Sequence, residues 1–106
     1  MSSVDITNLF NSILEETHKY IPSGQINSIL GGYGLLVASI TPEHGFDNPF
    51  IRQSLNTALH LSELGFQSEY ITCALLYYPY IKGNVSRDEL LTKFGTSIAT
   101  IMDRLC

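Results

Sequence analysis

Apolar residues recur at intervals of three and four positions along most of this chain, and this spacing constrains the fold more than any other feature. The interval is that of an amphipathic α-helix, whereas a half-buried strand would alternate apolar and polar residues. Proline, glycine and capping residues separate the periodic segments, as they separate helices in globular proteins. The sequence therefore predicts an all-α protein, a compact bundle of about six helices with no convincing strand. The predicted helices cover residues 4–20, 25–40, 49–64, 69–80, 87–94 and 97–105.

Two of the predicted helices begin with specific capping signals. Asn48 at a cap position, followed by Pro49 in the first turn, is typical of a helix N-terminus. Ser86 and Glu89 have the spacing of a capping box, in which each side chain accepts a hydrogen bond from the backbone of the other residue. The last predicted helix is still amphipathic where the chain stops, so we expect a minimal or truncated version of a larger helical architecture.

Three glycines, Gly31, Gly32 and Gly34, interrupt the second predicted helix. Each glycine inside a helix costs about 1 kcal/mol relative to alanine. We expect either a close contact with another helix or a break at this point. A phosphate-binding loop is disfavoured, because no Gly-Lys-Ser/Thr motif follows the glycines and no predicted strand precedes them.

The length, charge, cysteine content and apolar stretches of the chain limit which partners and which cellular location it can have. The chain has 106 residues, enough for one domain over residues 1–106, and 15% of them are charged. Six lysines and arginines against ten acidic residues give a net charge of −4, which lacks the basic surface that nucleic-acid binding needs. Two cysteines are too few for a disulfide scaffold, and the longest apolar stretch, residues 31–40, is too short to span a membrane. We therefore expect a cytoplasmic protein whose partner is neither a nucleic acid nor a membrane.

Four segments in the second half of the chain form a pattern in their order and spacing. They are Pro49-Phe50-Ile51-Arg52-Gln53-Ser54-Leu55, then Ala58 to Gly65, Ala74-Leu75-Leu76-Tyr77-Tyr78, and Phe94 to Asp103. Over residues 48–105 this pattern resembles the N-terminal HD hydrolase domain of the RelA/SpoT family, which makes and degrades guanosine tetraphosphate and pentaphosphate. The resemblance implies an HD-domain-like helical bundle, and residues 1–47 match it only loosely.

The metal ligands of that family are replaced at every position that matches. In the family, a histidine at the helix start and a His-Asp pair bind a divalent metal, usually manganese, and a Glu-Asp pair is catalytic. The matching positions here are Gln53, the pair Tyr77 and Tyr78, and the pair Ile81 and Lys82. An amide, and phenols of pKa about 10, are poor ligands for a hard cation at neutral pH, and without the metal no water is activated. The resemblance therefore implies a vestigial site with no metal, no cofactor and no hydrolase activity.

Four tyrosines, Tyr70, Tyr77, Tyr78 and Tyr80, would surround this vestigial site, and two interpretations compete. The rings either fill the emptied cavity, because an unfilled void would cost stability, or form a platform on which a nucleotide base stacks. Filling is favoured, because a base site would also need cations to bind phosphates, and few cations are nearby in the sequence.

The first functional hypothesis is a catalytically inactive RelA/SpoT-type domain that acts as a regulatory or protein-interaction module linked to guanosine tetraphosphate metabolism. In the family, inactive hydrolase domains still pack against a synthetase domain and restrain it. The last helix motivates this hypothesis, because we expect its face of Ile98, Ile101, Met102 and Leu105 to be open for a protein partner or for self-association.

The second hypothesis is a metal-independent pseudoenzyme that senses a guanine nucleotide. Its candidate ligand contacts are His44, Arg52 and Tyr80, together with Lys82. His44 falls in the segment that replaces the basic, nucleotide-contacting segment of the family, although the sequence favours a plain loop histidine over a phosphate contact.

The third hypothesis is an active metal-dependent phosphohydrolase with relocated ligands such as His60 and Glu63. The sequence disfavours it, because residues three apart on a helix more often form a solvated surface pair. Cys73 lies within an apolar run, which predicts a buried core thiol rather than a nucleophile.

Overall fold

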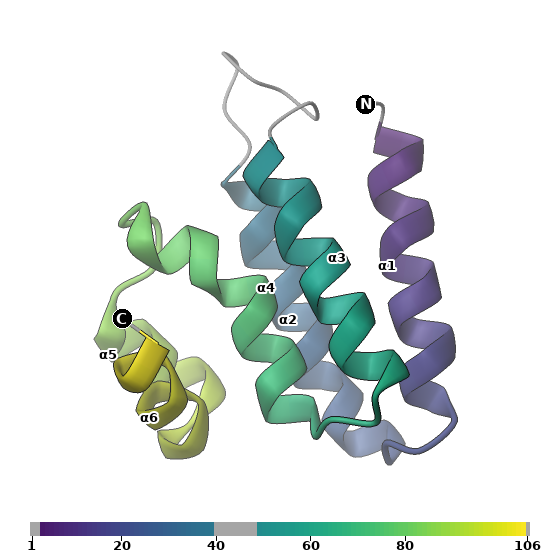
Figure 1. Cartoon of the computed structure of the whole chain (residues 1–106). Coiled ribbons are helices and arrows are strands. Elements are labelled where there is room, and N and C mark those ends of the chain that lie inside the picture. The colour runs from purple at the N-terminus through teal and green to yellow at the C-terminus, as the bar shows by residue number, and fades with distance from the viewer. Residues whose placement is uncertain (1–2, 40–48, 106) are drawn as a thin grey trace.

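The computed structural model describes residues 3–39 and 49–105, and within these ranges every regular element is a helix. The prediction of an all-α bundle is therefore confirmed, and each predicted helix has a counterpart at nearly the predicted bounds. The helices are α1 (Ser3–His18), α2 (Ser23–Ala38), α3 (Pro49–Glu63), α4 (Ser68–Ile81), α5 (Arg87–Phe94) and α6 (Thr96–Leu105) (Figure 1). Pro49 begins α3 as expected, whereas its predicted cap, Asn48, lies outside the described residues.

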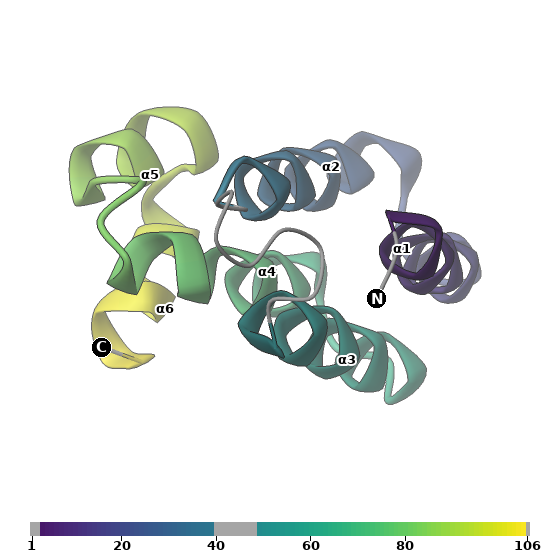
Figure 2. The ribbon, with the colours of Figure 1, turned by 90° about the horizontal axis from the view of Figure 1, so that it is seen from above.

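Helix α4 occupies the centre of the molecule. The first four helices run alternately down and up, and seen from above α4 lies between α2 and α3 (Figures 1 and 2). Helix α1 packs on α3 at one side, while α5 and α6 lie on the opposite side, where α6 contacts α4 (Figure 2). Three different faces of α4 are therefore set against other helices.

The buried apolar side chains form two clusters, and α4 contributes to both. The first cluster, which we call the main core, joins helices α1 to α4 and includes Ile71 and Leu75 of α4. The second, which we call the side core, joins α4 to α5 and α6. Its buried members are Cys73, Leu76, Val85, Leu90, Ile98, Ala99 and Met102. Among the described buried residues, α4 is the one helix shared by the two clusters.

The sequence left open whether the glycines of α2 mark a close helix contact or a break. The structure has the close contact, which is with α4, and α2 continues through the glycines without a break. A Cβ atom on Gly32 would lie 3.4 Å from the Cβ atom of Leu75 and from the Cγ2 and carbonyl oxygen atoms of Thr72. A Cβ atom on Gly31 would lie 3.2 Å from the Phe94 ring of α5, whereas a Cβ atom on Gly34 would have no neighbour within 4 Å. Only a small residue at position 32 lets the two helices approach this closely.

The turns are fixed by polar contacts and by glycines with positive φ. Gly65 (φ 81°) ends α3, and the hydroxyl of Tyr20 donates to the carbonyl of Phe66 in the same turn at 2.6 Å. The predicted capping box is confirmed, because the backbone N–H of Glu89 donates to Ser86 Oγ at 3.1 Å and the Glu89 side chain accepts from the Ser86 N–H. Helix α5 then ends at Gly95 (φ 93°).

The apolar face of α6 is not open, so the prediction of an exposed surface there is wrong. Ile98 is 2% exposed and Met102 is fully buried, because both pack in the side core. Ile101 is partly buried, and Leu105 alone of the four predicted residues is exposed. The periodicity correctly predicted an apolar face, but the cover comes from α4 and α5 of the same chain.

Candidate functional site

An open groove with a volume of about 700 Å³ runs between α3, α4 and α6. Its α4 wall consists of Tyr70, Cys73, Ala74, Tyr77, Tyr78 and Ile81. With the exception of Cys73, these residues follow one another at helical intervals of three, four and one, so they form a continuous stripe along α4. Ala74 and Tyr78 of the stripe also pack on the edge of the main core, whereas Tyr70, Tyr77 and Ile81 stay exposed.

The α3 wall is more polar than the α4 wall. Phe50 and Leu61 lie at its two ends, and Gln53, Ser54 and Thr57 lie between them. Helix α6 closes the third side with Ile101, Arg104 and Leu105, and Phe66 from the α3–α4 turn completes the lining. Apart from Arg104 and the tyrosine hydroxyls, the groove is thus apolar toward α4 and α6, and it carries amide and hydroxyl groups toward α3.

Large apolar side chains are unusually exposed along this groove. Phe50 is 53% exposed, Ile81 54% and Leu105 54%. Phe66, Tyr70 and Tyr77 are also exposed and line the same groove. Six of the ten exposed large hydrophobic residues in the described chain therefore gather at one place. Contiguous exposed apolar surface of this kind marks a binding site more often than scattered single residues do.

Two aromatic pairs shape the groove. The rings of Phe50 and Tyr78 stack with their centroids 5.2 Å apart and their planes 6° apart, which ties the start of α3 to the end of α4. Phe66 and Tyr70 meet edge to face, with centroids 6.0 Å apart. The Lys82 ammonium donates to the Tyr78 hydroxyl at 3.3 Å. These contacts hold several aromatic rings of the lining in defined orientations.

The structure brings most of the predicted vestigial-site residues together. Gln53, Tyr77, Tyr78 and Ile81 all line the groove, and Lys82 contacts Tyr78 at its edge. The predicted nucleotide contacts are not gathered there. Arg52 is exposed on α3 and Tyr80 packs against the side core, so neither lines the groove, and His44 lies outside the described residues.

The prediction that the tyrosines fill the cavity is wrong for the groove as a whole. Tyr77 is 41% exposed, and the space beside it is open. The reason is geometric, since Tyr77 projects from the part of α4 that no helix of the described chain covers. Of the tyrosines that line the groove, only Tyr78 is partly buried, against Phe50 and the main core, while Tyr80 packs outside the groove on the side core.

No metal site emerges within the part of the chain that the structure describes. No group of three or more histidine, cysteine, aspartate or glutamate residues comes together there. His60 and Glu63 do form the predicted pair, with Nδ1 3.7 Å from Oε1, but their side chains are 79% and 51% exposed and neither lines the groove. Two exposed donors on one helix do not provide the convergent ligands that a hard cation requires.

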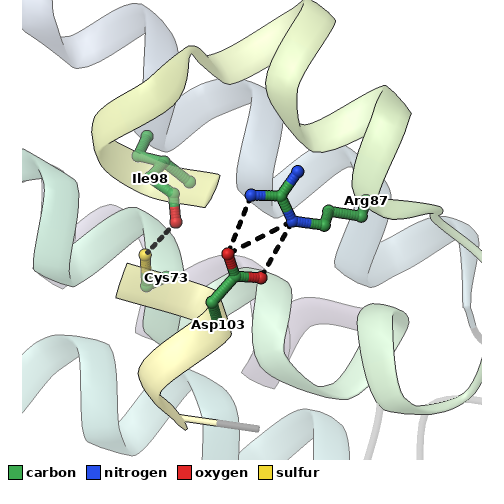
Figure 3. A network of polar contacts seen from close by, with 4 residues as sticks. All are labelled: Cys73, Arg87, Ile98 and Asp103. Carbon is green, nitrogen blue, oxygen red and sulfur yellow. Dashed lines mark hydrogen bonds and ion pairs between the residues drawn. The ribbon is translucent and has the colours of Figure 1, made fainter. Parts of the chain in front are cut away.

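Cys73 is a buried thiol at the base of the groove. It is 1% exposed, and its Sγ donates to the Ile98 carbonyl at 3.7 Å (Figure 3). Burial, with the nearby charge of Glu69 as a smaller cause, raises the pKa of the Cys73 thiol to about 12. A thiol held in its protonated form is a poor nucleophile, which agrees with the predicted core role.

Charge is sparse in the groove. Arg104 is the one formally charged residue among those that line it, and no ion pair joins Arg104 to another residue in the described ranges. Three other cations, Lys19, Arg87 and Lys93, are each paired with a carboxylate. The arrangement is suited to binding an apolar partner with one negative charge. The residues that line the groove in the described chain include no carboxylate and no imidazole.

Sequence reasoning missed Phe50, Phe66 and Arg104 as groove residues. A signal was present on α4, which carries more apolar residues than one buried face can use. Its apolar positions surround most of the helix, and a helix of that kind must be covered on several sides. The sequence alone did not show which of those sides stays uncovered.

No family model, curated protein or solved structure matches this chain in comparisons with known proteins. Within the described residues, no helix is both long and apolar enough to cross a membrane.

Proposed function

We propose that this chain is a non-catalytic helical domain of RelA/SpoT type whose open groove binds a protein partner. The observation that best supports this proposal is that one apolar groove is lined by Gln53, Tyr77, Tyr78 and Ile81. These are positions at which the resembled family places metal ligands and catalytic carboxylates. Their convergence supports the resemblance, and their side chains support the loss of hydrolase activity.

The chemistry of the lining supports a binding role over a catalytic one. None of the described lining residues carries a carboxylate or an imidazole. Metal-assisted hydrolysis needs such groups to hold the cation and to orient the attacking water. Apolar surface without these groups can still bind a partner strongly through burial, at about 25 cal/mol per Å² removed from water.

The partner that we propose is a RelA/SpoT-type synthetase domain, in the same chain or another, which the domain would regulate. With that partner, the protein would act in guanosine tetraphosphate metabolism and in the cytoplasm. The buried, unpaired Cys73 thiol supports a reducing location, since structural disulfides are rare there.

Metal-independent nucleotide binding is the second candidate, and the Phe50–Tyr78 stack beside Lys82 favours it. An aromatic pair with an adjacent ammonium can bind a base and a phosphate. The candidate ranks second because a polyphosphate would meet a single lining cation, Arg104, in a chain of net charge −4.

The test combines an activity assay with two titrations. Purified protein with Mn²⁺ should leave guanosine tetraphosphate intact, and calorimetry with GDP, GTP and guanosine tetraphosphate, with and without Mn²⁺, should show no heat of binding. Titration with an isolated synthetase domain should show binding. Hydrolysis at an enzymatic rate would overturn the proposal, and metal-independent nucleotide binding would move the second candidate to first place.

Two variants locate the binding surface. Tyr77 in the groove and Leu91 on α5 are both 41% exposed, so aspartate at either position introduces a charge at equal exposure. Tyr77→Asp should abolish binding of the synthetase domain, while Leu91→Asp should leave it unchanged. Equal effects of the two variants would show that the groove is not the binding site.

A further inference from the structure

Resting on the binding role proposed above, we infer that the groove receives an amphipathic α-helix of about three turns from the partner. Its apolar stripe would lie against α4 and α6. A carboxylate on it would pair with Arg104. The length, shape, backbone chemistry and charge of the groove each support this occupant.

The length of the groove corresponds to a short helix. The α3 wall extends from Phe50 to Leu61 and the α4 wall from Tyr70 to Ile81. At 1.5 Å per residue each wall is about 16 Å long, or three helical turns. A helix about 10 Å in diameter and half embedded over that length occupies about 600 Å³. The groove volume of about 700 Å³ accommodates it.

The walls of the groove favour a helix over an extended peptide or a small molecule. Peptides that bind by strand addition gain affinity from backbone hydrogen bonds to a sheet edge, whereas α3, α4 and α6 are helices whose backbone bonds are internal. Small-molecule sites enclose most of the ligand surface. Here lining side chains such as Phe50 and Ile81 stay more than half exposed, so a larger occupant is needed to cover them.

The polarity of the walls sets the orientation of the occupant. Apolar residues of the incoming helix would face Tyr77 and Ile101, and its polar flank would face Gln53 and Thr57 on α3. Arg104 has no carboxylate partner in the described chain, although three of the other cations do. The occupant is therefore expected to place Asp or Glu beside its apolar stripe.

Selection from a helix-constrained peptide library tests this inference and does not require an identified partner. Peptides of about fourteen residues on an alanine-rich helical scaffold are displayed on phage and selected on the intact protein. The selected sequences should carry large apolar residues at i, i+3 or i+4, and i+7, with an acidic residue beside them. A proline placed at the centre of a selected peptide should abolish binding, because it breaks the helix.

Three protein variants connect the selected peptides to the groove. Tyr77→Asp should weaken their binding by at least about tenfold, and Leu91→Asp should leave it unchanged. Arg104→Glu should weaken the binding of acidic peptides by about tenfold, and it should favour peptides with lysine or arginine in place of the acidic residue. Circular dichroism of each variant confirms that the fold is retained.

The inference would be overturned if the library yielded no helical sequence, or if a selected peptide still bound with proline at its centre. It would also be overturned if Tyr77→Asp did not weaken peptide binding, or if the Arg104→Glu variant selected the same peptides as the wild type. Saturable binding of a fatty acid in the groove without peptide enrichment would replace the helix with a small apolar ligand. The proposed function fails separately, through hydrolysis of guanosine tetraphosphate or absence of synthetase-domain binding.

Discussion

Arg87 and Asp103 join the start of α5 to the end of α6 through a bidentate salt bridge. The Arg87 Nε donates to Asp103 Oδ1 at 3.0 Å, and its Nη2 donates to Oδ2 at 2.8 Å (Figure 3). Parallel hydrogen bonds of this kind fix the relative geometry of two side chains better than a single contact does. The pair therefore helps to hold α6 in the position where it forms a wall of the groove.

This ion pair should make the stability of the protein sensitive to acid. The hydrogen bonds from Arg87 lower the pKa of Asp103 below its ordinary value of 3.8. A carboxyl whose pKa is lowered on folding stabilises the folded state above the ordinary pKa, and that contribution is lost as the pH falls through the lowered pKa. Asp103→Asn should therefore lower the midpoint of thermal unfolding at pH 7, and the difference from wild type should shrink below about pH 4. Glu15→Gln, which changes an exposed carboxylate on α1, is the control, and a difference independent of pH would contradict the prediction.

The glycines of α2 should respond in opposite directions to larger side chains. Gly32→Val should lower the free energy of unfolding by about 1–3 kcal/mol, because the added methyl groups would meet Thr72 and Leu75 of α4. Gly34→Ala should raise it by up to about 1 kcal/mol, because alanine favours the helix and nothing lies within 4 Å. Urea unfolding of the two variants measures both effects. Equal effects would mean that α2 and α4 are not in close contact at Gly32.

Thr72 carries a buried hydroxyl that should destabilise the fold. Its Oγ1 has no hydrogen-bond partner among the described residues, whereas the buried Ser62 Oγ donates to the Leu59 carbonyl at 2.7 Å. Thr72→Val keeps the methyl group that packs on Gly32 and removes the unpaired hydroxyl, so it should raise the free energy of unfolding by about 1 kcal/mol. Ser62→Ala, which removes a paired hydroxyl, should lower it by a similar amount. A loss of stability in Thr72→Val would show that its hydroxyl has a partner.

The Cys73 thiol should react slowly until the protein unfolds. With a pKa of about 12, only about one thiol in ten thousand is ionised at pH 8, and the side chain is buried as well. In a Cys106→Ser background, alkylation by iodoacetamide should be far slower in the folded protein than in urea. Reaction of the folded protein at the rate of the unfolded one would place Cys73 at the surface.

Helix periodicity predicted the secondary structure well because it depends on local spacing, which the sequence contains directly. The capping box was predicted for the same reason, since it depends on the residue types at positions 86 and 89. The glycines of α2 left a close contact and a break as alternatives, and only the packing of α2 on α4 decides between them. The apolar face of α6 was also predicted, but its cover was not. Periodicity shows that Ile98 and Met102 share an apolar face, and tertiary packing decides that α4 and α5 bury them.

The groove also shows that local sequence patterns do not determine tertiary packing. The positions of Gln53, Tyr77 and Tyr78 came from a sequence pattern, and the structure places them together. Whether the tyrosines fill the space depends on which part of α4 remains uncovered, and no local property of Tyr77 contains that information. Arg104 is more than twenty residues away from Tyr78 in the sequence, so its place in the lining follows from how α6 packs on α4.

Because the main core and the side core are separate clusters, we expect the molecule to open in two steps. Buried residues of α5 and α6 belong to the side core alone, so these helices can detach while α1 to α4 keep their own core intact. Native-state hydrogen exchange would then show two levels of protection, with the backbone amides of α5 and α6 exchanging first. Detachment would also remove a wall of the groove. An occupant that contacts α6 would therefore slow exchange in both helices, including amides that it does not touch.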